Sequence, residues 1–174
     1  MKKLLTVLVT LSLVFLLGAC ASEQGDYEPG VYFGYTDGHQ NTFAVVTIDE
    51  NGFISQIFVD TVYMKADPEG PATWTSRGNE VTGYATTKMS LDGGCGYNMW
   101  PAKPVVDCKV EGEIMWHDQV SMVIEAVIAE QGIPTFTIVD GKFDQDAADA
   151  ITGVTITVTA YLSAIENALN EAKK

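Results

Sequence analysis

Three segments in the first third of the chain are rich in β-branched and aromatic residues, and they constrain the fold more than any other feature. They span residues 31–35, 42–48 and 53–59. The second and third are separated by a short stretch that ends in Asn51 and Gly52, and an Asn-Gly pair readily adopts the positive φ angles of a hairpin turn. Strands joined by so short a turn must run in opposite directions. The sequence therefore predicts an antiparallel meander.

The spacing of apolar residues changes to a helical period twice in the second half of the chain. We expect one helix within residues 111–131, where Gly132 ends the pattern, and a last helix that begins near Thr155, with Thr152 or Thr155 as its cap. The apolar positions are Val120, Val123, Ile124, Val127 and Ile128 in the first helix and Val158, Leu162, Ile165 and Leu169 in the second. The fold predicted from these patterns is α+β, with an antiparallel sheet and two main helices packed on it.

The remaining segments are less regular. Residues 64–79 contain several prolines and glycines without periodicity and predict a loop, and residues 92–104 predict another. Residues 81–91 fit either a strand or a short helix. Residues 135–139 and 142–143 flank an Asp-Gly turn, which indicates two short strands.

The first residues have the composition of a targeting signal. Lys2 and Lys3 precede an uncharged apolar run over residues 4–17, which is shorter than the roughly 20 apolar residues that span a bilayer. The run ends in Leu-Gly-Ala-Cys, which resembles the lipobox of bacterial lipoproteins, so we expect Cys20 to carry a lipid. An ordinary secretory signal with a chance cysteine is the alternative. The expected division is a signal peptide over residues 1–19, a lipidated cysteine and tether over residues 20–28, and one domain over residues 29–174.

The acidic composition and the few cysteines limit the possible partners. The net charge of −13 becomes −15 without residues 1–19, which contain two lysines and no acidic residue. Such a charge disfavours binding to nucleic acid or to an anionic lipid surface. Outside the cell, Cys95 and Cys108 can form a disulfide or stay as two free thiols. Together with His39 and His117 they are too few for a zinc or haem site, so no metal is expected and both histidines are expected at the surface.

The motif with the clearest chemical meaning covers residues 149–157. Gly153 permits a tight turn, and hydroxyl-bearing threonines flank it on both sides. If a helix starts just afterwards, its free N–H groups and its dipole form an anion site suited to a phosphate. From the residues alone, the interpretation of these threonines as a cap of the last helix is favoured over a phosphate site.

The same segment resembles the motif of the FMN-binding domain family. The spacing Asp-x-x-Thr-Gly-Val-Thr-x-Thr is similar to the Asp-x-x-Ser/Thr-Gly-Ala-Thr pattern of that family, which includes flavin-bearing subunits of Rnf-type and sodium-pumping NADH:quinone oxidoreductases and small lipoproteins of extracellular electron transfer. In those proteins a flavin transferase esterifies the FMN phosphate to the last Thr of the Gly-Ala-Thr triplet. The resemblance implies the following sites: Thr155 as the acceptor, Thr152, Gly153 and Thr157 around the phosphate, Asp149 at the acidic position, and Val154 where the common pattern has Ala. Because of Val154, covalent and noncovalent attachment both stay open.

The order of elements before the motif also resembles single-domain lipoprotein members of that family. These elements are a Tyr-x-Met pair, Tyr97 and Met99, and a helix that carries Trp116 and Gln119. A flat apolar ring is best held by aromatic and thioether surface, so we expect Tyr97, Met99 and Trp116 to contact the isoalloxazine. Ordinary core positions are the alternative for each of the three.

The resemblance implies a membrane-anchored, extracytoplasmic FMN-binding lipoprotein that transfers electrons at the outer face of a bacterial cell membrane. Such a protein is an electron carrier rather than an enzyme with its own substrate. Its expected partners are a flavin transferase for maturation and a redox partner protein or a quinone-linked donor in the membrane. A lipoprotein binding module without a flavin is the second hypothesis, and an oxidoreductase that reduces a small acceptor directly is the third.

Overall fold

A computed structural model describes residues 24–37, 41–76, 79–91, 94–147 and 149–174. The predictions for the signal peptide, Cys20 and His39 lie outside these residues. The elements in chain order are β1 (Gly30–Thr36), β2 (Thr42–Ile48), β3 (Ile54–Ala66), β4 (Ala72–Ser76), β5 (Asn79–Thr87), α2 (Trp116–Glu130), β6 (Ile138–Val139), β7 (Lys142–Phe143) and α3 (Thr159–Ala172). Among the described residues, no helix combines the length and the apolar character needed to cross a bilayer.

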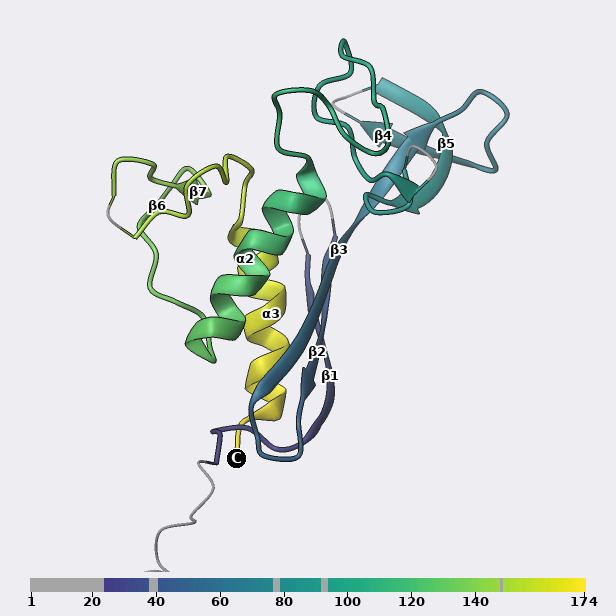
Figure 1. Cartoon of the computed structure of the whole chain (residues 1–174). Helices are drawn as coiled ribbons and strands as arrows, with labels where there is room; N and C mark the ends of the chain where they lie inside the picture. Colours follow the sequence, from purple (N-terminus) through teal and green to yellow (C-terminus); the bar gives the residue numbers. More distant parts are fainter. Residues whose placement is uncertain (1–23, 38–40, 77–78, 92–93, 148) are drawn as a thin grey trace, which may run out of the picture.

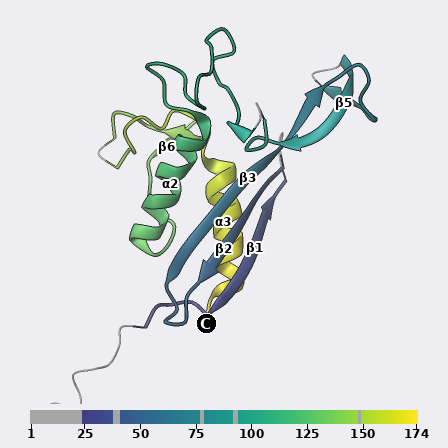
Figure 2. The same cartoon turned by 45° about the vertical axis from the view of Figure 1, so that its right-hand side comes forward.

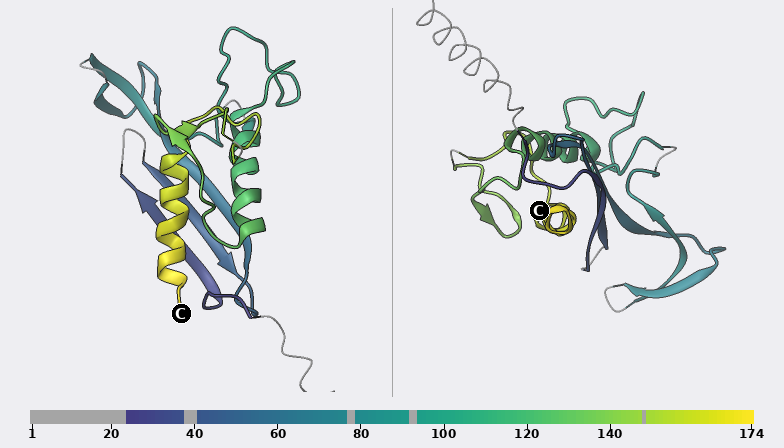
Figure 3. Two further views of the ribbon diagram at one scale, coloured as in Figure 1. Left: turned by 90° about the vertical axis from the view of Figure 1, so that its left-hand side faces the viewer. Right: turned by 90° about the horizontal axis from the view of Figure 1, so that it is seen from below.

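The described residues form a five-stranded antiparallel sheet, a two-stranded sheet of β6 and β7, and two helices, which confirms the predicted α+β class. The strand order is β1-β2-β3-β5-β4. Both helices lie on the same face of β1, β2 and β3, while β4 and β5 extend beyond the helices (Figures 1 and 3). The long strand β3 belongs to both parts, because its first half pairs with β2 up to Thr61 and its second half pairs with β5 from Val62 onward. Figure 2 shows β3 passing from one part of the sheet to the other.

The predicted meander of β1, β2 and β3 is confirmed, including the hairpin turn before β3. Gly52 has a φ of 86°, which is the left-handed backbone that glycine adopts without strain. The Asp49 carboxylate stabilises the same turn, because its Oδ1 accepts hydrogen bonds from the backbone N–H groups of Asn51 and Phe53, both at 2.9 Å. The turn therefore sets the register of the hairpin.

The core lies between the sheet and the helices. Strand β2 alternates, so that Ala44, Val46 and Ile48 are buried beneath the helices. Helix α3 contributes a buried stripe that ends in Ala172 and includes Tyr161, Leu162, Ala164, Ile165, Ala168 and Leu169. Small residues on this stripe let α3 approach β1 closely: a Cβ added at Gly34 would lie 1.9 Å from the carbonyl oxygen of Ala164. Tyr27 also belongs to the core, so the packed domain begins before residue 29.

The predicted loop over residues 64–79 is wrong. Strand β3 continues to Ala66, and residues 72–76 form β4, which pairs with β5. Pro68, Gly70 and Pro71 occupy the turn between the two strands, where Gly70 N–H donates to the carbonyl of Asp67. The Thr- and aromatic-rich sequence on either side follows its β propensity. Residues 79–87 resolve as the strand β5, the first of the two alternatives for that region.

The predicted start of the last helix is also wrong. Helix α3 begins at Thr159, and its N-terminal residue Val158 makes no side-chain capping bond, so neither Thr152 nor Thr155 caps it. Residues 154–159 instead alternate between buried and exposed, as an extended segment does, with Val154 buried and Thr155 exposed. The run of β-branched residues disfavours helical backbone and so delays the helix. Helix α2, Trp116–Glu130, lies within the predicted range of residues 111–131.

The two cysteines form a disulfide. Cys95 and Cys108 are bridged with their Cα atoms 4.7 Å apart, which resolves the alternative between a bridge and free thiols. The bridge closes the loop that carries Tyr97 and Met99. The two backbone positions Asp107 and Cys108 have φ angles of 50° and 59°, so the chain bends sharply as it enters the bridge.

The close approach of β1 and α3 gives a direct test of the packing. We expect Gly34→Ala to lower the free energy of unfolding by about 2–3 kcal/mol, because the added methyl group meets backbone atoms that cannot move independently. Urea denaturation of both variants measures the effect. Gly132→Ala is the matched control, since its added Cβ makes an ordinary contact at 3.6 Å with Tyr27 Oη. Equal stability of the two variants would contradict this packing.

Candidate functional site

A pocket of about 650 Å³ lies where the bend of the sheet meets the start of α2 and the extended segment before α3. Its volume falls within the range typical of small-molecule sites. The lining residues are Thr42, Thr61, Lys88, Tyr97, Met99, Trp116, Lys142, Thr155, Ile156, Thr157, Ala160 and Tyr161. Five of the residues predicted from the sequence therefore line one pocket: Thr155, Thr157, Tyr97, Met99 and Trp116.

One buried amide side chain fixes the threonine segment at the edge of this pocket. Gln119 is 1% exposed, and its Oε1 accepts hydrogen bonds from the backbone N–H groups of Thr155 at 2.8 Å and Ile156 at 3.2 Å. Its Nε2 donates to the carbonyl of Ile114 at 3.0 Å. The Gln119 side chain thus connects the threonine segment to α2. The Thr155 hydroxyl also donates to the same Oε1, at 3.4 Å, although the residue as a whole is exposed.

These hydrogen bonds correct the expected anion site. The N–H groups of Thr155 and Ile156 point to Gln119, and the first turn of α3 starts at Thr159, so the motif does not present free helix N–H groups at Thr155. An anion at Thr155 would instead meet hydroxyl groups and the side chain of Lys142, which follows Gly141. Gly141 packs on the same segment, because a Cβ there would lie 2.9 Å from Thr157 Cγ2.

The back wall of the pocket is a rigid pair of aromatic residues from the two helices. Trp116 Nε1 donates a hydrogen bond of 3.0 Å to the Tyr161 hydroxyl, and the two rings meet edge to face with centroids 6.0 Å apart. The Tyr161 hydroxyl also bonds to the side chain of Thr61 on β3, and the Thr61 hydroxyl lies 3.2 Å from that of Thr42 on β2. Burial raises the pKa of Tyr161, so this phenol stays protonated. The chain of hydroxyls links both helices to the sheet beneath the pocket.

The opposite wall comes from the loop closed by the disulfide. Tyr97 packs against Tyr63 of β3 with ring centroids 5.5 Å apart, and Met99 lies near it in the same pocket lining. Lys88, just after β5, lies between the walls: its Nζ is 5.2 Å from the ring centroid of Tyr97 and 5.3 Å from that of Trp116. Burial lowers the pKa of Lys88, and the nearby Asp60 opposes that shift.

Four of the predicted site residues do not line the pocket. Asp149 instead supports the segment just before β6, because its Oδ2 accepts hydrogen bonds from the backbone N–H of Thr137 at 2.5 Å and from the Thr137 hydroxyl at 3.2 Å. Thr152 is exposed, and Gly153 has a φ of 89° and faces Ile114. Val154 is fully buried in the core. Together these residues shape the turn that brings Thr155 to the pocket.

His117 is half-buried rather than at the surface. Its Nδ1 is buried without a hydrogen-bond partner among the described residues, and a Cβ added at Gly96 would lie 3.1 Å from it. It does not line the pocket. Within the described part of the chain, no group of three or more His, Cys, Asp or Glu residues lies together as a metal site would require.

Seven residues of the pocket were missing from the sequence prediction: Thr42, Thr61, Lys88, Lys142, Ile156, Ala160 and Tyr161. Lys142 carries a sequence signal, because it directly follows an Asp-Gly turn. Lysine and arginine together number only ten in the chain, so a lysine at such a turn stands out. Lys88 follows no such turn and carries no comparable signal. Thr42, Thr61 and Tyr161 carry no such signal, since they look like ordinary strand and helix residues until the sheet brings them together.

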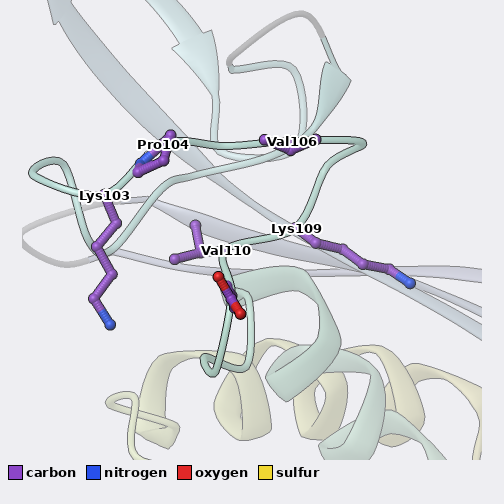
Figure 4. Close-up of a pocket in the computed structure, with 6 residues that line it drawn as sticks. Lys103, Pro104, Val106, Lys109 and Val110 are labelled. Carbon is purple, nitrogen blue, oxygen red and sulfur yellow. The ribbon is translucent and has the colours of Figure 1, made fainter.

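A second pocket, of about 660 Å³, lies in the loop region near the disulfide. It is lined by Lys103, Pro104, Val106, Lys109, Val110 and Glu111. Its two lysine side chains extend in different directions (Figure 4), and Lys103 is already paired with Glu113. It contains no aromatic residue and none of the residues predicted from the sequence. The pocket beside Thr155 is therefore the better candidate site.

Comparison with known proteins identifies no relative. No family model matches the chain, and no curated protein or solved structure matches it either. The resemblance to the FMN-binding domain family therefore rests on the sequence motif and the order of elements before it, and stays a prediction.

The Gln119 contacts lead to a prediction. We expect Gln119→Leu to lower the free energy of unfolding by about 2–4 kcal/mol, because it leaves the N–H groups of Thr155 and Ile156 without their acceptor. Hydrogen exchange at these two amides should accelerate more than at amides in the middle of α3. Gln56→Leu, at an exposed position on β3, is the control and should change stability by less than about 0.5 kcal/mol. Unchanged hydrogen exchange at the amides of Thr155 and Ile156 would rule out their hydrogen bonds to Gln119.

Proposed function

We propose that the chain is a membrane-anchored, extracytoplasmic electron-transfer protein that holds FMN in the pocket beside Thr155. The observation that carries this proposal is the convergence of Thr155 with Tyr97, Met99 and Trp116 on one pocket. The loop, α2 and the motif are far apart along the chain, yet the residues expected for the phosphate and for the ring line the same space. Two lysines in that lining offer positive charge to a phosphorylated ligand, although the whole chain has a net charge of −13.

Thr155 has the accessibility that an attachment site needs. Its side chain is exposed, while Gln119 holds the backbone of Thr155 and Ile156 from the opposite side. To meet a phosphate, the hydroxyl gives up its long contact of 3.4 Å with Gln119 Oε1, while the two backbone hydrogen bonds keep the segment in place. Val154 supports covalent attachment, because its side chain is buried in the core and leaves the exposed side of Thr155 clear.

The protein's remaining contribution is to position and shield a flat ring. When bound, FMN supplies the redox chemistry by accepting one or two electrons. Trp116 and Tyr161 are core residues, 1% and 5% exposed, and the part of them that reaches the pocket is inflexible because their side chains are hydrogen-bonded to each other and packed edge to face. Tyr97 and Met99 provide aromatic and thioether contacts from the other side, and both adapt well to a planar apolar ligand.

The proposed location and partners follow from the N-terminal sequence and from the charge. A lipid on Cys20 and a polar tether would keep the domain at the outer face of the cell membrane, where a flavin transferase attaches the FMN. Electrons would come from a redox partner protein or from a quinone-linked donor in the membrane. The acidic surface favours a basic docking face on the partner.

The attachment site is tested by mass spectrometry. Co-expression of the chain with a flavin transferase should give a yellow protein, and the peptide that contains Thr155 should gain the mass of FMN less one water. We expect Thr155→Ala to lose this mass entirely and Thr155→Ser to retain it at least in part. Thr157→Ala is the matched control, since Thr157 is also an exposed hydroxyl of the pocket lining and should not be the acceptor.

A different result would favour the second hypothesis, a binding module of the cell envelope without a flavin. The extensive hydrogen bonding of Gln119 to the motif is also what a purely structural turn would have. Colourless wild-type protein after co-expression with a competent transferase, with no affinity for added FMN, would contradict the proposed function.

A further inference from the structure

Lys88 is an unusual residue for the interior of an acidic domain. It is only partly exposed, and its ammonium group faces the rings of Tyr97 and Trp116 at 5.2 and 5.3 Å. The ion pairs found among the described residues are Lys103–Glu113 and His117–Asp118, and neither includes Lys88. A cation removed from water without a carboxylate in contact is costly, and two aromatic faces offset only part of that cost.

The nearest acidic group does not serve as its partner. The Asp60 carboxylate is 2% exposed, and its Oδ1 accepts from the backbone N–H of Thr61 at 2.7 Å and from that of Met89 at 3.2 Å. Asp60 therefore holds the backbone around Lys88 in place. Its negative charge also raises the pKa of Lys88, against the lowering by burial. The Lys88 backbone is fixed as well, because its N–H donates to the carbonyl of Thr61 at 2.9 Å.

The two lysines of the pocket belong to different parts of it. Lys142 follows Gly141, which packs on Thr157 and whose carbonyl accepts from Val158 N–H at 2.7 Å. It therefore accompanies the threonine segment, where the phosphate is proposed. Lys88 faces the two aromatic side chains proposed to hold the ring. The charge of Lys88 is thus available to the ring, and that of Lys142 to the phosphate.

We infer that Lys88 is a positioning residue that stabilises negative charge on the reduced flavin ring and so raises the reduction potential of the bound FMN. This inference rests on the proposed function. In the two-electron step the oxidised ring takes up two electrons and one proton and becomes a monoanion. The electrons come from the donor protein, or from dithionite in a titration. Lys88 forms no covalent bond and keeps its proton; it acts through the attraction between its ammonium group and the anion.

This role opposes the effect of the surface charge. Twenty-three acidic residues disfavour any added negative charge on the ring, which lowers the reduction potential. Most of those carboxylates lie in water, which screens them. A cation inside the pocket is screened far less, so a single lysine there can outweigh several surface carboxylates.

The test measures the midpoint potential of FMN attached to the full chain, in the wild type and in three variants. Removing the charge in Lys88→Gln should weaken the preference of the site for the anionic reduced ring about tenfold, which corresponds to a potential about 30 mV lower for a two-electron couple. Lys88→Arg keeps the charge and should stay close to the wild type. Lys109→Gln removes one positive charge at an exposed position away from this pocket and is the matched control.

A second measurement does not depend on how the variants fold. Acetic anhydride labels accessible lysines, and peptide mass spectrometry quantifies each site in the wild type with and without attached FMN. We expect the labelling of Lys88 to fall at least tenfold on FMN attachment, whereas that of Lys109 should be unchanged. Equal labelling of Lys88 in both forms would overturn the inference.

The remaining outcomes separate this inference from the proposed function. If Lys88→Gln carries FMN and has the wild-type potential, the role of Lys88 is wrong while FMN binding stands. If Lys109→Gln lowers the potential as much as Lys88→Gln, the effect is one of overall charge and the inference fails. A folded Lys88→Gln chain that takes up no FMN would assign Lys88 to attachment and overturn its assignment to the ring. A wild-type chain without FMN would overturn both proposals.

Discussion

The hydrogen bonds of Gln119 are the constraint on which the pocket depends. A single amide oxygen inside the core accepts two consecutive backbone N–H groups and so fixes an extended segment that belongs to no sheet. Buried N–H groups require an acceptor, and here it comes from α2 rather than from a neighbouring strand. The consequence is directional: Ile156 faces the core and Thr155 faces the pocket. Without these hydrogen bonds, nothing would fix which residues of this extended segment face the core and which face outward.

The bend of β3 gives the pocket its place. At Thr61 and Val62 the strand leaves β2 and begins to pair with β5, and the helices cover only the first part of the sheet. The residues after β5 and the loop that follows therefore return toward the start of α2, where Lys88 and Tyr97 meet Trp116. The hydroxyl chain from Tyr161 through Thr61 to Thr42 ties this junction together. The floor of the site is thus built from structural contacts that need no ligand.

Local sequence signals predict the parts of this fold in which neighbouring residues decide the structure. The Asn51-Gly52 turn and the alternation of β2 act over a few residues, so the meander could be predicted. One prediction failed, and one residue of the pocket was missed, because residues distant in the sequence decide the result. The residues around Thr155 have the composition of a helix cap, yet Gln119 takes their N–H groups and α3 starts later. Lys88 looks like any surface lysine in the sequence, and only the bend of β3 brings it between two aromatic rings. The motif singles out Thr155, but the sequence does not show which other residues line the pocket beside it.

The disulfide has a consequence for the order in which the protein matures. Cys95 and Cys108 close a loop that contributes Tyr97 and Met99 to one wall of the pocket. A crosslink over a loop of this size restricts the unfolded chain and contributes roughly 3 kcal/mol. In a reducing cytoplasm the loop would lack this disulfide, whereas an oxidising environment allows it to form. Under the proposed function, export would come first, thiol oxidation second and occupation of the pocket last, so a chain kept in the cytoplasm would lack the crosslink in one wall of its pocket.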